Sequence, residues 1–150
     1  MSPPRSRHPL LGFEGRMGRV AFLGWGLPVL VAGRVALAPV LLAFSEEAPA
    51  VSPALLLALA VLGGAVLLAA LWALLALIVK RLHDRDLSGG HAAWIMAVLL
   101  FAGLIGMPLD PLLDELVAIF ALGLLAWLAI VRGTEGPNRF GPPPASRREG

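Results

Sequence analysis

The sequence predicts an all-α, polytopic membrane protein: one membrane domain built as a bundle of four transmembrane helices. Hydrophobic residues make up 58% of the 150 residues, charged residues only 15%, and the mean hydropathy is +0.83. Soluble domains contain about 45–50% apolar and about 25% charged residues. A soluble core of this size cannot bury so many apolar side chains, whereas stretches of about 20 of them cross lipid as helices.

Four apolar stretches predict helices at residues 20–44, 54–79, 92–107 and 112–131. The first follows a basic segment, residues 1–19, and imitates a signal peptide. The length of this polar segment and the Arg34 inside the apolar stretch instead favour a helix that stays in the mature protein. The second stretch contains no charged residue, and Ser52-Pro53 is a typical start for it. Asp114 suits the N-terminus of the fourth through the helix dipole.

The second predicted helix has one small face. Ala65, Ala69 and Ala73 recur every four residues. Small residues let another transmembrane helix approach closely. We therefore expect this face to contact a second copy of the chain or another membrane protein.

The charges between the helices predict the orientation. Residues 1–19 carry a net charge of +3, residues 80–91 (the hinge) +1 and residues 132–150 +2, whereas the two remaining connections carry −2 and −3. The positive-inside rule places the basic side in the cytoplasm. Both termini are expected there, with residues 142–150 forming a disordered, proline-rich tail.

The hinge is open to two interpretations. Arg81 and Asp84 lie three residues apart, so they pair on one face if the second helix continues, and Ser88 with two glycines then completes a helical hairpin. Alternatively, His83, Asp84, Asp86 and His91 supply the side-chain types of a metal or acid/base site. No ligand spacing, cysteine or paired nucleophile accompanies them, so we expect no metal, no cofactor and no enzymatic activity.

Three motifs carry a resemblance to a known family. They are Phe13-Glu14-Gly15-Arg16-Met17-Gly18-Arg19, Lys80-Arg81-Leu82-His83-Asp84 with Ser88-Gly89, and Gly136-Pro137-Asn138-Arg139-Phe140-Gly141. Together and in this order they resemble domain-of-unknown-function family 805. The resemblance implies a small bacterial inner-membrane protein without an established activity. The chain departs from the family at Asp86, where glycine is usual, and at Gly90-His91, where an aromatic pair is usual.

All three motifs fall on the predicted cytoplasmic side, where their polar residues can form one cluster. The candidates are Arg16, Arg19, Arg81, His83, Asp84, Asn138 and Arg139. One interpretation is a network that pins the helix ends together. The other is a pocket for a phosphate group, such as an anionic lipid headgroup, because arginine binds carboxylate and phosphate alike. Internal acids such as Asp84 favour the pinning network.

Arg34 is a charge inside an apolar helix. Counted from Val20 it lies about 21 Å along the helix, past the bilayer midplane. A charge there costs a few kcal/mol on insertion scales, so we expect it to snorkel or to pair with an acid on the outer side. The candidate partners are Glu46, Glu47, Asp114 and Glu115. An ion or proton path is the alternative.

The expected function is that of a structural or accessory component of the bacterial inner membrane, with membrane lipids as partners. A binder of anionic lipid or another phosphate group at the cluster is the first alternative, and a small transporter or membrane-embedded enzyme is the second. The small net charge of +2 gives no reason to expect nucleic acid as a partner.

Overall fold

The computed structural model describes residues 9–45, 52–104 and 111–144. Four α-helices make up its regular structure: α1 (Arg19–Ala43), α2 (Pro53–His83), α3 (His91–Leu104) and α4 (Pro111–Ile130). The all-α fold class is therefore confirmed. Of the predicted tail, residues 142–144 follow an irregular path and 145–150 lie outside the described residues.

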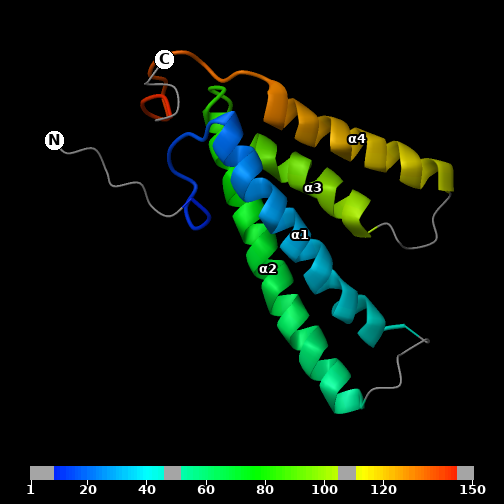
Figure 1. The fold of residues 1–150 in the computed structure, drawn as a ribbon. Helices are drawn as coiled ribbons and strands as arrows, with labels where there is room; N and C mark the ends of the chain where they lie inside the picture. The colour runs from blue at the N-terminus through cyan, green and yellow to red at the C-terminus, as the bar shows by residue number, and fades with distance from the viewer. Residues whose placement is uncertain (1–8, 46–51, 105–110, 145–150) are drawn as a thin grey trace.

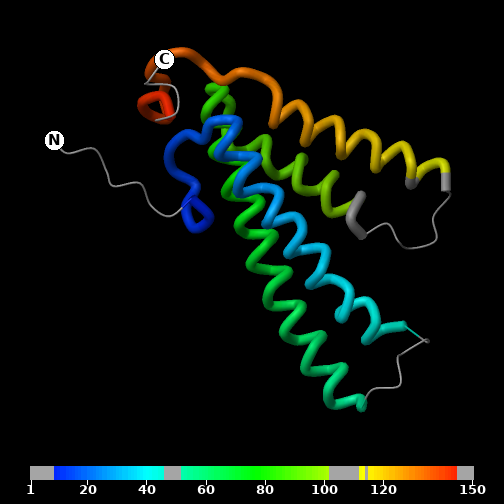
Figure 2. The backbone as a smooth tube through the Cα atoms, viewed as in Figure 1, coloured from blue at the N-terminus to red at the C-terminus, as the bar shows by residue number. Residues whose placement is uncertain are grey.

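The helices form two hairpins, α1 with α2 and α3 with α4 (Figure 1). The hairpins meet at the end that carries the α2–α3 turn and diverge toward the other end, as the backbone trace also shows (Figure 2). The segment before α1, the α2–α3 turn and the segment after α4 lie together at the meeting end. These are the three segments with a positive charge.

Small residues hold α1 and α2 close together. A Cβ added at Gly63 would lie 2.6 Å from the Ala36 carbonyl oxygen and 2.9 Å from Pro39 Cγ, and one added at Gly33 would lie 3.6 Å from Ala70 Cβ. The face that α2 turns to α1 is thus centred on Gly63 and Ala70. Ala65 and Ala69 are exposed and Ala73 is buried, so the expected contact of this face with a partner stays a prediction.

Both ends of α2 have local causes. The Ser52 hydroxyl accepts a hydrogen bond from the Leu55 amide at 3.2 Å, with Pro53 in the first turn. At the other end, the Leu87 amide bonds the Leu82 carbonyl and the Asp86 amide bonds the His83 carbonyl. This is the Schellman pattern, with Asp86 at φ +59° in the left-handed position that glycine usually takes. Aspartate tolerates that conformation better than most residues do.

The hydrophobic core lies at the meeting end of the hairpins. Leu77, Ile78, Leu82, Ile95 and Leu128 are fully buried. Away from it, α1 and α2 are long and apolar enough to cross a membrane, and only 17% and 6% of their most apolar 18-residue windows are buried. The described parts of α3 and α4 contribute shorter apolar helices, His91–Phe101 and Glu115–Ile130.

Two adjacent glycines test the α1–α2 packing. We predict that Gly63→Ala lowers the melting temperature in detergent, because the new methyl group overlaps Ala36 and Pro39, and overpacking costs about 1–3 kcal/mol. Gly64→Ala is the control, since a Cβ there meets nothing within 4 Å, and it should be neutral or stabilising by up to about 1 kcal/mol. Circular dichroism melts of both variants decide; equal melting temperatures would contradict the packing described.

Candidate functional site

A buried carboxylate forms the centre of the polar cluster. Asp84 follows the last residue of α2, and its side chain is fully buried. Oδ2 accepts a hydrogen bond from Arg81 Nη1 at 2.7 Å, while Oδ1 accepts bonds from Arg16 Nε at 3.2 Å and Nη2 at 3.1 Å. One carboxylate therefore joins two guanidinium groups, each on a side chain that is at most 1% exposed. The Arg81–Asp84 pair has the i, i+3 spacing expected from the sequence.

Arg81 also binds the C-terminal end of α4. Its Nε donates to the Leu128 carbonyl at 2.6 Å, and its Nη2 donates to the Val131 carbonyl. The last carbonyls of a helix have no partner within the helix, and a cation there is favoured by the helix dipole. Nη1 reaches the Met17 carbonyl at 3.4 Å as well. One side chain of α2 thereby contacts the segment before α1 and the end of α4.

Arg16 ties the N-terminal segment to the segment after α4. Its Nη2 donates to the Thr134 carbonyl at 2.7 Å, and its Nη1 donates to the Gly136 carbonyl at 2.7 Å and the Gly141 carbonyl at 3.3 Å. Beside it, the Met17 amide donates to the Lys80 carbonyl at 3.1 Å. Every Arg16 nitrogen is thus occupied by an acceptor of the chain itself.

The segment after α4 closes over Asp84. The Thr134 amide donates to the Asp84 carbonyl at 2.8 Å. A Cβ added at Gly133 would lie 2.0 Å from Asp84 Oδ2, so only glycine fits at this position. Asn138 Nδ2 donates to the His83 carbonyl at 2.9 Å and to Thr134 Oγ1 at 3.0 Å. We call Arg16, Arg81, Asp84 and Thr134 the clasp.

The remaining predicted cluster residues surround the clasp. The His83 ring stacks on Phe140, with the ring centroids 3.8 Å apart, and its Nδ1 lies 3.2 Å from the Gly15 carbonyl oxygen. Arg139 pairs with the exposed Asp86, Nε to Oδ1 at 3.2 Å. Arg19 donates to the Ile130 carbonyl at 3.3 Å. All seven residues singled out from the sequence therefore lie at one end of the structure.

Other residues of this end were not singled out by the sequence patterns. Thr134 and Gly133 lie just outside the third motif, and nothing in the sequence assigns them to Asp84. Arg85 lies over the Trp127 ring, 3.6 Å from its centroid, which is a cation–π contact. Its Nη1 is buried without a hydrogen-bond partner among the described residues, and this burial lowers the pKa of Arg85.

The hinge residues do not assemble as the metal interpretation requires. Within residues 9–45, 52–104 and 111–144, no three His, Cys, Asp or Glu side chains gather in a group that could hold a metal ion. Asp84 forms ion pairs with Arg16 and Arg81, and Asp86 forms one with Arg139. Lys80, which the sequence also places within reach of Asp84, donates to the Pro9 carbonyl at 2.7 Å instead.

Arg34 lies apart from the cluster, on α1. It lines a largely apolar cavity of about 540 Å³ to which all four helices contribute. Arg34 forms no ion pair with Glu115, the one candidate partner whose side chain the structure describes. Glu46 and Glu47 lie outside the described residues, as does the Asp114 side chain.

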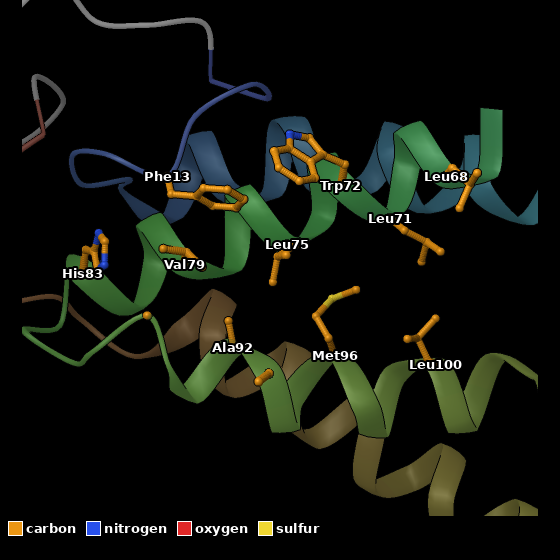
Figure 3. Close-up of a pocket in the computed structure, with 12 residues that line it drawn as sticks. Phe13, Leu68, Leu71, Trp72, Leu75, Val79, His83, Ala92, Met96 and Leu100 are labelled. Carbon is orange, nitrogen blue, oxygen red and sulfur yellow. The ribbon is translucent and has the colours of Figure 1, made fainter. Parts of the chain in front are cut away.

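A second cavity lies between α2 and α3 beside the clasp. Figure 3 shows Leu71, Leu75 and Val79 of α2 facing Ala92 and Met96 of α3. Phe13 lies next to Trp72, with the ring centroids 5.1 Å apart. The volume is about 700 Å³, and His83 stands at the end nearest the clasp.

Comparison with known proteins identifies a family. No curated protein and no solved structure matches the chain. A family described as "Protein of unknown function (DUF805)" matches residues 10–142, a range that contains all four helices and all clasp residues. The chain therefore belongs to this DUF805 family.

Proposed function

We propose that the protein is a structural or accessory component of the bacterial inner membrane, with four transmembrane helices and both termini in the cytoplasm. In this proposal the clasp is the cytoplasmic lock of the molecule. It fixes the segment before α1, the end of α2 and the segment after α4 against one another. The two hairpins then present their apolar sides to lipid or to other membrane proteins.

The observation that carries the proposal is that the clasp arginines are satisfied internally. Asp84 and the carbonyls of Leu128, Thr134 and Gly136 accept their hydrogen bonds. A phosphate-binding pocket needs donors that are available to a ligand. Donors already held by the protein support the pinning network over the phosphate pocket.

The distribution of apolar and basic residues supports the membrane location. Large apolar side chains of α1, α2 and α4 are exposed along much of each helix, and such patches on a monomer indicate contact with lipid or a partner. Trp25, Trp94 and Trp127 lie within two turns of the clasp end and are 37–45% exposed. Tryptophan is enriched at this depth, where the hydrocarbon meets the headgroups.

In the four-span topology, the α3–α4 hairpin contains the helix that is shortest relative to the thickness of the bilayer. α4 has 20 residues and α3 has 14, which correspond to about 30 Å and about 21 Å at 1.5 Å per residue. A hydrocarbon core is about 30 Å thick. The crossing by α3 therefore needs local thinning of the bilayer or a contribution from residues 105–110.

Asp84 and Asp86 lie in the same turn, but only Asp84 is buried. Substituting each of them therefore distinguishes a buried lock from an exposed ion pair. We predict that Asp84→Asn strongly lowers the melting temperature, because two buried guanidinium groups lose their counter-charge, which costs about 3–5 kcal/mol. Asp86→Asn is the matched control. Its ion pair is about half exposed and contributes at most about 1 kcal/mol. Thermal unfolding of both variants in detergent, without added ligand, makes the comparison; similar melting temperatures would count against the lock.

Gly133 tests the same lock without changing any charge. Gly133→Ala places a methyl group where Asp84 Oδ2 lies, so we expect it to displace the segment after α4 and to destabilise the fold by about 1–3 kcal/mol. Gly123→Ala is the control, because a Cβ at Gly123 meets nothing within 4 Å. Thermal melts of the two variants provide the measurement. An unchanged melting temperature in Gly133→Ala would contradict the close approach to Asp84.

Single cysteines test the topology, because the chain has no cysteine of its own. We expect Ser88→Cys and Ser146→Cys to react with a membrane-impermeant maleimide only in inverted membrane vesicles. Glu47→Cys and Asp110→Cys should react only in intact spheroplasts. If Asp110→Cys reacts from the same side as Ser88→Cys, the α3–α4 hairpin does not cross the membrane and the four-span proposal fails.

A further inference from the structure

The cavity between the two hairpins combines an apolar lining with a single charged side chain. Leu30 of α1, Leu74 of α2, Met96 of α3 and Leu125 of α4 are among its lining residues. Its volume of about 540 Å³ lies within the range of about 300–1,000 Å³ typical of small-molecule sites. Arg34 is the only Asp, Glu, Lys or Arg that lines it in the described part of the chain.

Arg34 stands toward the end of the cavity that is far from the clasp. It is 15 residues beyond Arg19, the start of α1, which corresponds to about 22 Å along the helix axis. Gly33 and Leu37 flank it, whereas Leu30, Leu74 and Leu125 lie closer to the clasp end. In a hydrocarbon core about 30 Å thick, an arginine at this position reaches the outer headgroup region by snorkelling.

We propose that this cavity binds an anionic phospholipid of the outer leaflet. Arg34 holds the phosphate of the headgroup, and an acyl chain runs from there along the apolar lining toward the clasp. The inference rests on the proposed membrane embedding but not on the role of the clasp. It assigns to Arg34 a phosphate ligand, whereas the sequence also offers Glu46, Glu47 and Asp114 as acidic partners.

Charge and shape both point to this occupant. A guanidinium in an apolar setting needs a counter-charge, because an unpaired charge at this depth costs a few kcal/mol. A phosphate accepts the planar fork of arginine in a bidentate arrangement. The apolar remainder of the cavity matches a hydrocarbon chain and not a polar solute. The two hairpins diverge toward the end of the molecule far from the clasp (Figure 1), and in this proposal the lipid enters from that end without crossing the clasp.

The test is lipid titration of the full-length protein, delipidated in a maltoside detergent, with bound lipids counted by native mass spectrometry. Phosphatidylglycerol is compared with phosphatidylcholine of identical acyl chains. We expect the wild-type protein to prefer phosphatidylglycerol about tenfold, a ratio equivalent to about 1.4 kcal/mol. Arg34→Gln should abolish the preference, and Arg34→Lys should retain most of it. Circular dichroism verifies that each variant stays helical.

Two phenylalanine substitutions on α4 test the cavity itself. Ala118 lines the cavity, so Ala118→Phe should fill it and weaken the binding of both lipids. Ala126 is exposed on the same helix and does not line it, so Ala126→Phe should bind like the wild type. Equal lipid binding by the two variants would overturn the proposal.

The remaining outcomes separate this inference from the proposed function. A preference for phosphatidylglycerol that survives Arg34→Gln but disappears in Arg139→Gln would place the lipid at the clasp end and overturn the Arg34 site. Alkaline carbonate extraction of membranes that contain the protein tests whether the protein is embedded in the bilayer. A protein released by carbonate contradicts the membrane location and this site together, whereas an embedded protein without Arg34-dependent selectivity contradicts this site alone.

Discussion

The fold depends on the burial of one carboxylate between two guanidinium groups. Asp84, Arg16 and Arg81 are removed from solvent almost completely, and desolvating three charged groups is compensated only when every group finds partners. The carbonyls at the end of α4 and in the segment after it meet this requirement by accepting hydrogen bonds from the two arginines. The buried charges therefore determine where the three polar segments lie, and through them where both hairpins begin.

The same constraint explains why the two ends of the molecule differ. At the clasp end, hydrogen bonds and the apolar cluster around Leu77, Leu82 and Ile95 fix the helices. At the far end, α1 and α2 remain close through Gly63, but the second hairpin diverges from them (Figure 1). The two cavities lie between the hairpins, one beside the clasp and one lined by all four helices. In the proposed membrane setting such gaps need not be closed by the protein itself, because lipid chains fill apolar space as well as leucine does.

Local patterns predicted the parts of the structure that have local causes. Apolar length predicted the helices, Ser52-Pro53 the start of α2, and the i, i+3 spacing the Arg81–Asp84 pair. The hydrogen bonds from Arg16 to the Thr134 and Gly136 carbonyls join residues 118 and 120 positions apart in the sequence. No periodicity encodes such contacts. The role of Gly133 could not be predicted either, because the sequence does not distinguish a glycine required for close approach to Asp84 from other glycines in a polar loop.

Hydrogen exchange tests the clasp most directly. The Met17 and Thr134 amides lie outside the helices, yet they donate to the Lys80 and Asp84 carbonyls at 3.1 Å and 2.8 Å. If the clasp holds the two segments against α2, both amides exchange orders of magnitude more slowly in detergent-solubilised protein than in an unstructured peptide of the same sequence. Exchange of both at the peptide rate would show that these segments are free, and the account of a lock at this end would be wrong.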